Sequence, residues 1–147
     1  MDDAARLYGW RVDSETVKQS IAPPPASFDA HRTWLAGALH DPAISLFVAY
    51  DEDRGVDVGV VRIDRRAEDE VEVSLTIDPD QRGRGYSHDL IARGLEAAVG
   101  VRVVARVKAA NVRSLRAFRA LGFRDDGVGE LVRLVHDPAP VERGAQG

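Results

Sequence analysis

A glycine-rich turn between an alternating segment and a helical segment most constrains how this chain folds. Residues 70–78, EVEVSLTID, alternate between apolar and polar side chains, which is typical of a strand with one buried face. The turn PDQRGRGY follows, with Gly83 and Gly85 beside arginines, and SHDLIARGLEAAV then has an apolar helical stripe. A helix start offers unpaired backbone N–H groups, and glycine lets a ligand approach the main chain. Two interpretations remain, a tight turn alone or a phosphate site.

Two common phosphate-binding motifs are absent from the chain. No Gly-x-x-x-x-Gly-Lys-Ser/Thr pattern occurs anywhere in the sequence. The dinucleotide pattern Gly-x-Gly-x-x-Gly fails after Gly83 and Gly85, because His88 occupies its last position. The turn by itself does not decide between the two interpretations.

The remaining segments predict a mixed α/β (α+β) fold. Asp13 or Ser14 is a suitable cap for a short helix, and Ser27 is a suitable cap for a second one. The predicted helices are residues 13–21, 28–39, 87–99 and 111–121, and the predicted strands are 43–50, 56–64, 70–78, 101–109 and 129–137. The first three strands form an antiparallel meander, and the chain shows no repeat or linker. We expect the tail, residues 138–147, to be disordered.

Composition excludes several classes of protein. The 147 residues include no cysteine, so disulfides, thiolate catalysis and cysteine-bound zinc are excluded, and we expect no metal. A net charge of −4 argues against a nucleic-acid partner, which would require a basic face. The first ten residues do not resemble a secretory signal, and no apolar run is long enough to span a membrane. We therefore expect a cytoplasmic protein without a membrane partner.

A second motif supports the phosphate interpretation. The segment NVRSLRAFRALGF, which starts at Asn111, follows the glycine turn at a suitable separation. Together the two segments resemble the GNAT superfamily of acyl-CoA-dependent N-acyltransferases. The first family pattern is Arg/Gln-x-x-Gly-x-Gly/Ala, and the second is Asn-x-x-Ser-x-x-x-Tyr-x-x-x-Gly-Phe. The matching residues are Arg82 and Gly85, followed by Ser87 at the Gly/Ala position, and Asn111, Ser114, Gly122 and Phe123, with Phe118 at the tyrosine position.

The resemblance covers roughly Leu7 to Phe123 and implies the fold and the cofactor. It implies a GNAT-like mixed, mostly antiparallel central sheet with splayed strands and flanking helices, within one domain over residues 1–137. Acetyl-CoA would serve as co-substrate between two strands, with its pyrophosphate on the backbone of the turn and its pantetheine arm on a strand edge. The cofactor-binding residues implied are Leu75, Ile77, Arg82, Gly83, Arg84, Gly85, Tyr86, Ser87, Asn111, Ser114 and Phe118.

Acyl transfer to an amine requires a proton acceptor, and two residues are candidates for this catalytic role. Glu72 lies on the strand before the turn, where related sequences often carry an acidic residue, and His31 lies on an early helix. The alternatives are a solvent-facing strand glutamate and a structural histidine. Phe118 departs from the family because phenylalanine cannot protonate the leaving thiolate. Three alternatives follow. The thiolate leaves without an acid, Ser114 or Tyr86 supplies the proton in place of the tyrosine, or the protein is a non-catalytic acyl-CoA-binding module.

The first forty residues carry the information on the acceptor. Trp10, Arg11, His31 and Trp34 are the predicted substrate-binding residues. They resemble a GNAT branch that acetylates nucleotide-linked amino sugars of the pseudaminic-acid type, and similar N-terminal regions occur in ribosomal-protein N-terminal acetyltransferases. The tryptophans would stack on a ring and Arg11 would pair with a diphosphate, unless both tryptophans are core anchors. The partner is therefore expected to be a small-molecule amine, and the protein a monomer or homodimer.

Overall fold

The computed structural model describes residues 3–127 and 129–138. The helices are α1 (Asp3–Val12), α2 (Ser14–Gln19), α3 (Phe28–His40), the short 3₁₀ helix η1 (Pro79–Gln81), α4 (Tyr86–Ala97) and α5 (Val112–Ala120). The strands are β1 (Ile44–Asp51), β2 (Val56–Ala67), β3 (Glu70–Ile77), β4 (Arg102–Lys108), β5 (Arg124–Asp125) and β6 (Leu131–His136). None of the described helices has the length and apolar character that a membrane crossing requires.

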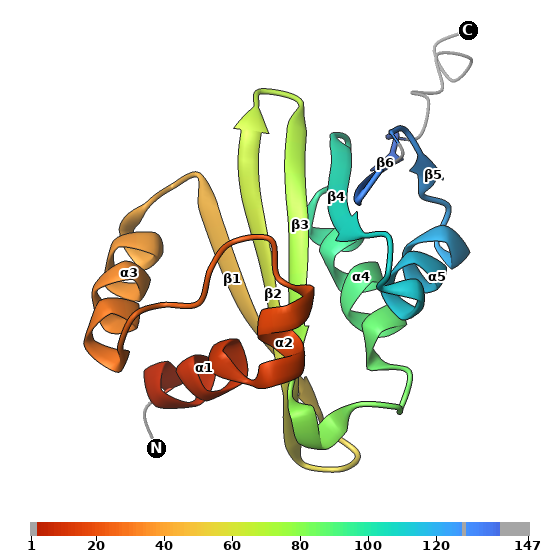
Figure 1. Cartoon of the computed structure of the whole chain (residues 1–147). Helices are drawn as coiled ribbons and strands as arrows, with labels where there is room; N and C mark the ends of the chain where they lie inside the picture. Colours follow the sequence, from red (N-terminus) through yellow and green to blue (C-terminus); the bar gives the residue numbers. More distant parts are fainter. Residues whose placement is uncertain (1–2, 128, 139–147) are drawn as a thin grey trace, which may run out of the picture.

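One mixed sheet organises the molecule, with strand order β1-β2-β3-β4-β6-β5. All neighbouring strands are antiparallel except β3 and β4, which are parallel. Helices α1, α2 and α3 lie on one side of the sheet, and α4 and α5 lie on the other (Figure 1). The predicted mixed, mostly antiparallel sheet with flanking helices is therefore confirmed.

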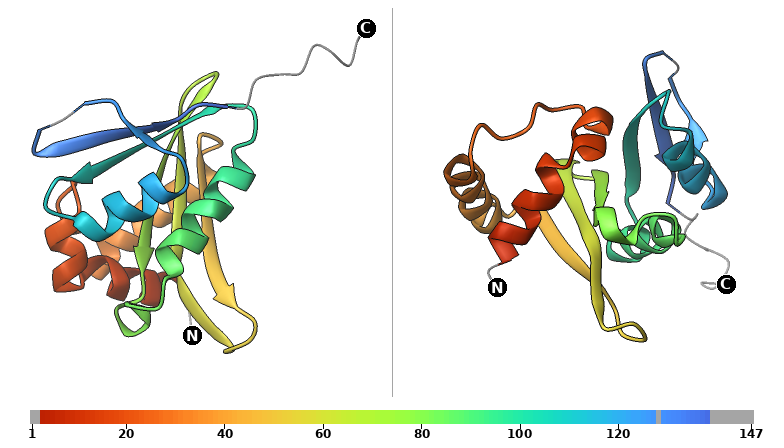
Figure 2. Two further views of the ribbon diagram at one scale, coloured as in Figure 1. Left: turned by 90° about the vertical axis from the view of Figure 1, so that its right-hand side faces the viewer. Right: turned by 60° about the horizontal axis from the view of Figure 1, so that its bottom comes forward.

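Strands β3 and β4 separate shortly after they meet. Their pairing is limited to Glu70–Glu72 against Arg102–Val104. Beyond Glu72, strand β3 continues to Ile77 beside β2 alone, while β4 continues to Lys108 beside β6. Figure 2 shows the two strands diverging from each other. This splay leaves the edge of β3 that faces β4 without a strand partner from Val73 onward in the described sheet.

The alternating pattern of β3 sets which side chains face which helices. Val71 and Val73 are buried in the main core on the side of α4, with Val73 opposite Ile63 of β2, while Glu72 points to the side of α1, α2 and α3. The apolar stripe of α4, including Leu90 and Ile91, covers the first of these faces. The helix start of α4 is thereby held at the end of β3.

The predicted helix caps are present, and three of the described elements are additions. Asp13 caps α2 by accepting from the backbone N–H of Thr16, and Ser27 caps α3 in the same way through Ala30. Helix α1, the short 3₁₀ helix η1 and the two-residue strand β5 were not predicted. The predicted tail, residues 138–147, lies outside the described residues apart from Pro138.

The backbone of β3 lies very close to the position that a Cβ atom on Gly59 of β2 would occupy. A Cβ atom there would collide with the carbonyl oxygen of Thr76 and come within 3.1 Å of Leu90. Because the obstacle is backbone, we expect Gly59→Ala to lower the free energy of unfolding by about 1–3 kcal/mol in urea denaturation. Gly37→Ala is the control, since nothing lies within 4 Å of its Cβ position in α3. In Gly37→Ala the free energy of unfolding should instead rise by up to about 1 kcal/mol, because alanine favours the helix. An equal decrease in both variants would contradict the close approach at Gly59.

Candidate active site

The glycine turn joins the end of β3 to the start of α4. Gly83 and Gly85 have φ values of +78° and +81°, a region that residues with a Cβ rarely occupy. Gly85 is the N-cap of α4, and no side chain caps this helix start. The first backbone N–H groups of α4 are therefore available to a ligand, together with the positive end of the helix dipole. This geometry agrees with the phosphate interpretation of the turn.

Helix α2 holds one side of the turn. The guanidinium of Arg82 forms an ion pair with Asp13 and donates to the hydroxyl of Thr16 at 3.0 Å. The hydrogen bond from Arg82 is the main cause that holds the pKa of Asp13 below its usual value. The predicted phosphate contact through Arg82 therefore involves a side chain that already binds α2, while its backbone remains part of the turn.

The hairpin between β1 and β2 holds the other side. The hydroxyl of Tyr86 donates to Asp51 at 2.6 Å and accepts from Arg54 at 2.8 Å. Arg54 also donates to Gln81 at 2.6 Å. Donation by Tyr86 is the main cause that lowers the pKa of Asp51. Arg54 and Asp51 were not singled out from the sequence, because only the folded hairpin brings them to a turn some thirty residues away.

Helix α2 also reaches the other arm of the splay. The ammonium group of Lys108, at the end of β4, donates to the carbonyl oxygen of Lys18 at 2.6 Å. Arg82 binds the opposite end of the same helix. A six-residue helix thus bridges the open ends of β3 and β4, on the side of the sheet that carries Glu72 (Figure 2).

Glu72 lies where the two strands begin to separate. Both carboxylate oxygens accept from Arg106 of β4, at 3.0 Å and 2.9 Å, and this bidentate pair raises the pKa of Arg106. Arg66 of β2 approaches the same carboxylate at 3.6 Å. The predicted base therefore joins β3 to β4 at the last residue of their pairing.

The predicted acceptor residues come from α1 and α3, and they differ in how far they are exposed. Trp10 is buried beneath Arg6 and has no exposed ring face in this structure, as the core-anchor alternative required. Trp34 is half-exposed, and its ring lies 5.0 Å from the guanidinium carbon of Arg62. His31 is buried between Tyr8 and Trp34.

Arg11 and His31 have atoms that lack hydrogen-bond partners. Arg11 Nη2 donates to the carbonyl oxygens of Ala22 and Pro23, at 2.8 Å and 3.0 Å. Its Nη1 and the Nε2 of His31 are buried without a hydrogen-bond partner among the described residues. Burial lowers the pKa of both groups, and the charge on Arg11 lowers that of His31 further. The imidazole is therefore neutral at physiological pH.

The family of the chain follows from its sequence. Residues 1–124 match the family described as the Acetyltransferase (GNAT) domain. The chain belongs to this family. Acetyl transfer is therefore its class of activity, as predicted from the two motifs. Among the described residues, no group of three or more metal-binding side chains could hold a metal ion.

Solved structures show the same fold. Spermidine N-acetyltransferase from Vibrio cholerae, in complex with CoA and spermine, has a TM-score of 0.83 and 19% identity, covering 92% of this chain and 89% of that one. A mutant of that enzyme gives a TM-score of 0.79 at 18% identity, covering 97% and 92% of the two chains. At these identities the likeness shows the fold alone. No curated protein matches the chain significantly in sequence.

The second GNAT motif is at the start of α5. Asn111 is the helix N-cap, and its side-chain oxygen accepts from the backbone N–H of Ser114 at 3.3 Å. Phe118 is buried against Phe123, with ring centroids 5.0 Å apart. These residues shape and anchor the helix, while the predicted contacts of Asn111, Ser114 and Phe118 with the cofactor stay predictions.

The stability of the protein is expected to depend on the protonation of His31. In the unfolded chain His31 takes up a proton as the pH falls through 6.5. In the folded protein its pKa is lower, so the buried imidazole stays neutral until a lower pH is reached. The free energy of unfolding should therefore decrease below pH 6.5 and level off below the folded pKa. Urea denaturation across this range should show a smaller decrease in His31→Gln. His88→Gln, at an exposed position in α4, is the control, and an unchanged slope in His31→Gln would contradict this assignment.

Proposed function

We propose that the protein transfers an acetyl group from acetyl-CoA to the primary amine of a small molecule. The single observation behind this proposal is the splay of β3 and β4, with the glycine turn at the end of β3. A phosphate group on the start of α4 and an extended arm along the free edge of β3 would bring the thioester to the region of Glu72. Leu75 and Ile77 lie along this path, and Arg84 and Ser87 lie at the turn.

The chemistry requires a neutral amine and a leaving thiolate. The amine nitrogen forms a bond to the carbonyl carbon, the carbon–sulfur bond breaks, and the amine proton passes to Glu72 directly or through water. His31 is the weaker candidate for this proton because its free nitrogen is buried. Phe118 supplies no acid, and the hydroxyl of Tyr86 is bound to the β1–β2 hairpin, so the thiolate leaves unassisted or with Ser114.

The acceptor is the less constrained part of the proposal. Nucleotide-linked amino sugars remain the leading class, because Trp34 is 41% exposed and its ring lies next to the guanidinium of Arg62. Polyamines are the acceptors of the similar Vibrio cholerae enzyme, and the N-termini of proteins are a further alternative. The buried, hydroxyl-free Phe118 favours a second candidate function, a non-catalytic acyl-CoA-binding module.

Release of CoA thiol from acetyl-CoA tests the proposal. The acceptor panel contains nucleotide-linked amino sugars, polyamines and N-terminal peptides, and binding of acetyl-CoA is measured in parallel by calorimetry. Acceptor-dependent release supports the enzyme. Acetyl-CoA binding without release from any acceptor supports the binding module, and absence of acetyl-CoA binding contradicts both functions.

A further inference from the structure

Five charged side chains form a continuous cluster over β2, β3 and β4, on the side of α1, α2 and α3. The members of this arginine cluster are Arg62, Asp64, Arg66, Glu72 and Arg106. Asp64 and Glu72 are direct partners in the β2–β3 register, and Glu72 is paired with Val104 of β4. The cluster therefore lies at the point where β3 and β4 begin to separate.

The carboxylates of the cluster are covered and its guanidinium groups are not. The side chains of Asp64 and Glu72 are 8% and 15% exposed. Those of Arg62, Arg66 and Arg106 are 36%, 47% and 41% exposed. The three guanidinium groups are more exposed than the two carboxylates, so a molecule that binds on this face contacts the arginines before the carboxylates.

The arginines keep donors that the two carboxylates do not use. Arg62 donates to Asp64 through Nε, at 3.0 Å, which leaves both Nη groups without a hydrogen-bond partner among the described residues. The guanidinium of Arg66 lies 3.6 Å from Glu72 and 4.0 Å from Asp64, and its side chain donates no hydrogen bond to any of the described residues. A guanidinium has five N–H donors in a planar fork that matches a carboxylate or phosphate.

We propose that the arginine cluster is the acceptor subsite for an oxyanion, and that the amine acetylated by this protein carries a phosphate or a carboxylate. This inference rests on the proposed function, which brings the thioester to Glu72. An oxyanion bound by Arg62 and Arg66 would place an amine on the same molecule over the splay. The exposed ring of Trp34, stacked on Arg62, would cover the acceptor from the side of α3.

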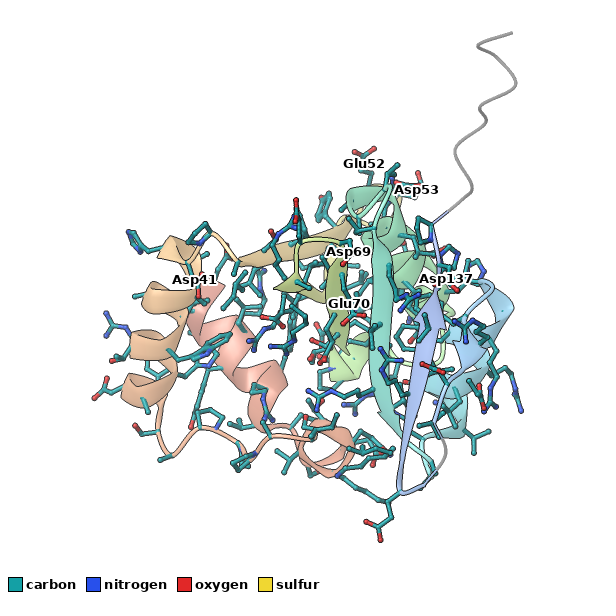
Figure 3. The ribbon with its side chains drawn as sticks, turned by 90° about the horizontal axis from the view of Figure 1, so that it is seen from above. Asp41, Glu52, Asp53, Asp69, Glu70 and Asp137 are labelled. Atoms are coloured by element: carbon teal, nitrogen blue, oxygen red, sulfur yellow. The ribbon has the colours of Figure 1, made fainter. Side chains whose placement is uncertain are left out.

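The same cluster disfavours a polyamine acceptor. An ammonium group is bound best by an unpaired carboxylate, whereas both carboxylates here are already paired with arginines that are more exposed than they are. The acidic side chains labelled in Figure 3 do not gather at one place. Asp41 follows α3, Glu52 and Asp53 are in the turn between β1 and β2, Asp69 and Glu70 are at the turn into β3, and Asp137 follows β6.

Pairs of amines that differ only in the anion test the proposal. The comparison of glucosamine 6-phosphate with glucosamine tests recognition of a phosphate group. The comparison of β-alanine with propylamine tests recognition of a carboxylate group, and spermidine represents a polycationic acceptor. We expect kcat/KM to be at least about tenfold higher for one anionic member than for its neutral counterpart. The pair that shows the preference identifies which oxyanion the cluster takes.

Substitutions assign the preference to the cluster. Arg66→Ala should reduce the anionic-to-neutral ratio of kcat/KM by about tenfold, and Arg66→Lys should retain part of it. Arg93→Ala is the control, because Arg93 is an exposed arginine of α4 that is paired with Glu96 on the opposite side of the sheet. The ratio should be the same in Arg93→Ala as in the unsubstituted protein.

Two outcomes would overturn the inference. Faster acetylation of spermidine or of the neutral amines than of both anionic amines would contradict it, while leaving acetyl transfer established. If no amine is acetylated, calorimetric titration of the CoA-saturated protein with glucosamine 6-phosphate tests the oxyanion subsite independently of catalysis. Binding that Arg66→Ala weakens and Arg93→Ala does not would support the oxyanion subsite even where the proposed catalysis fails, and absence of binding would overturn it.

Discussion

With Gly85 replaced by aspartate, the KM for acetyl-CoA is expected to rise by about 100-fold or more, because a second negative charge would stand in the phosphate site. The backbone at this position has φ +81°, and nothing lies within 4 Å of the added Cβ. Aspartate is among the few residues that tolerate this conformation, so the fold should persist. Steady-state kinetics and calorimetric titration with CoA measure the effect.

Gly100→Asp is the matched control for this substitution. Gly100 has φ +85° and equally open surroundings, but it lies in the turn between α4 and β4, at the other end of the helix. Both variants should lose similar conformational stability, and only Gly85→Asp should lose affinity for CoA. An equal loss of affinity in both would mean that the glycine turn does not bind the cofactor.

Local signals in the sequence predicted the framework of the site well. The alternation of β3 and the apolar stripe of α4 each depend on side chains within one element. The caps Asp13 and Ser27 depend on neighbours three residues away. Such features follow from a short window, and the structure retains them.

Contacts between distant segments could not be predicted in the same way. Arg82 matches a motif that suggested a phosphate contact, yet its guanidinium binds Asp13, 69 positions away. Tyr86 binds Asp51 across 35 positions, and Arg106 binds Glu72 across 34. These pairings depend on where the turn, the hairpin and β4 meet in space, and a single sequence holds no period or spacing that encodes them.

Helix α1 shows a related limit. This helix was not predicted from the sequence, and its one buried residue, Trp10, lies under Arg6. Arg6 in turn forms an ion pair with Asp57 of β2. The helix is therefore defined by tertiary contacts more than by its own pattern, which is the case where sequence periodicity is least informative.

Glu72→Gln is expected to lower kcat by roughly 10²–10⁴-fold if this residue accepts the amine proton. Glutamine keeps the shape of the side chain and can still accept one hydrogen bond from Arg106 through its single carbonyl oxygen, but it cannot take up the proton. The KM for acetyl-CoA should change little, because the glycine turn lies at the far end of β3. Acetyl transfer to the best acceptor, measured across pH, gives both constants.

Arg106→Gln separates catalysis by Glu72 from its role in joining the strands. Both variants break the bidentate pair between β3 and β4, but only Glu72→Gln removes the carboxylate. If Glu72 is the base, Arg106→Gln should keep kcat within about tenfold, because the carboxylate that accepts the proton is still present. Equal losses of kcat in the two variants would show that Glu72 only fixes the opening of the splay.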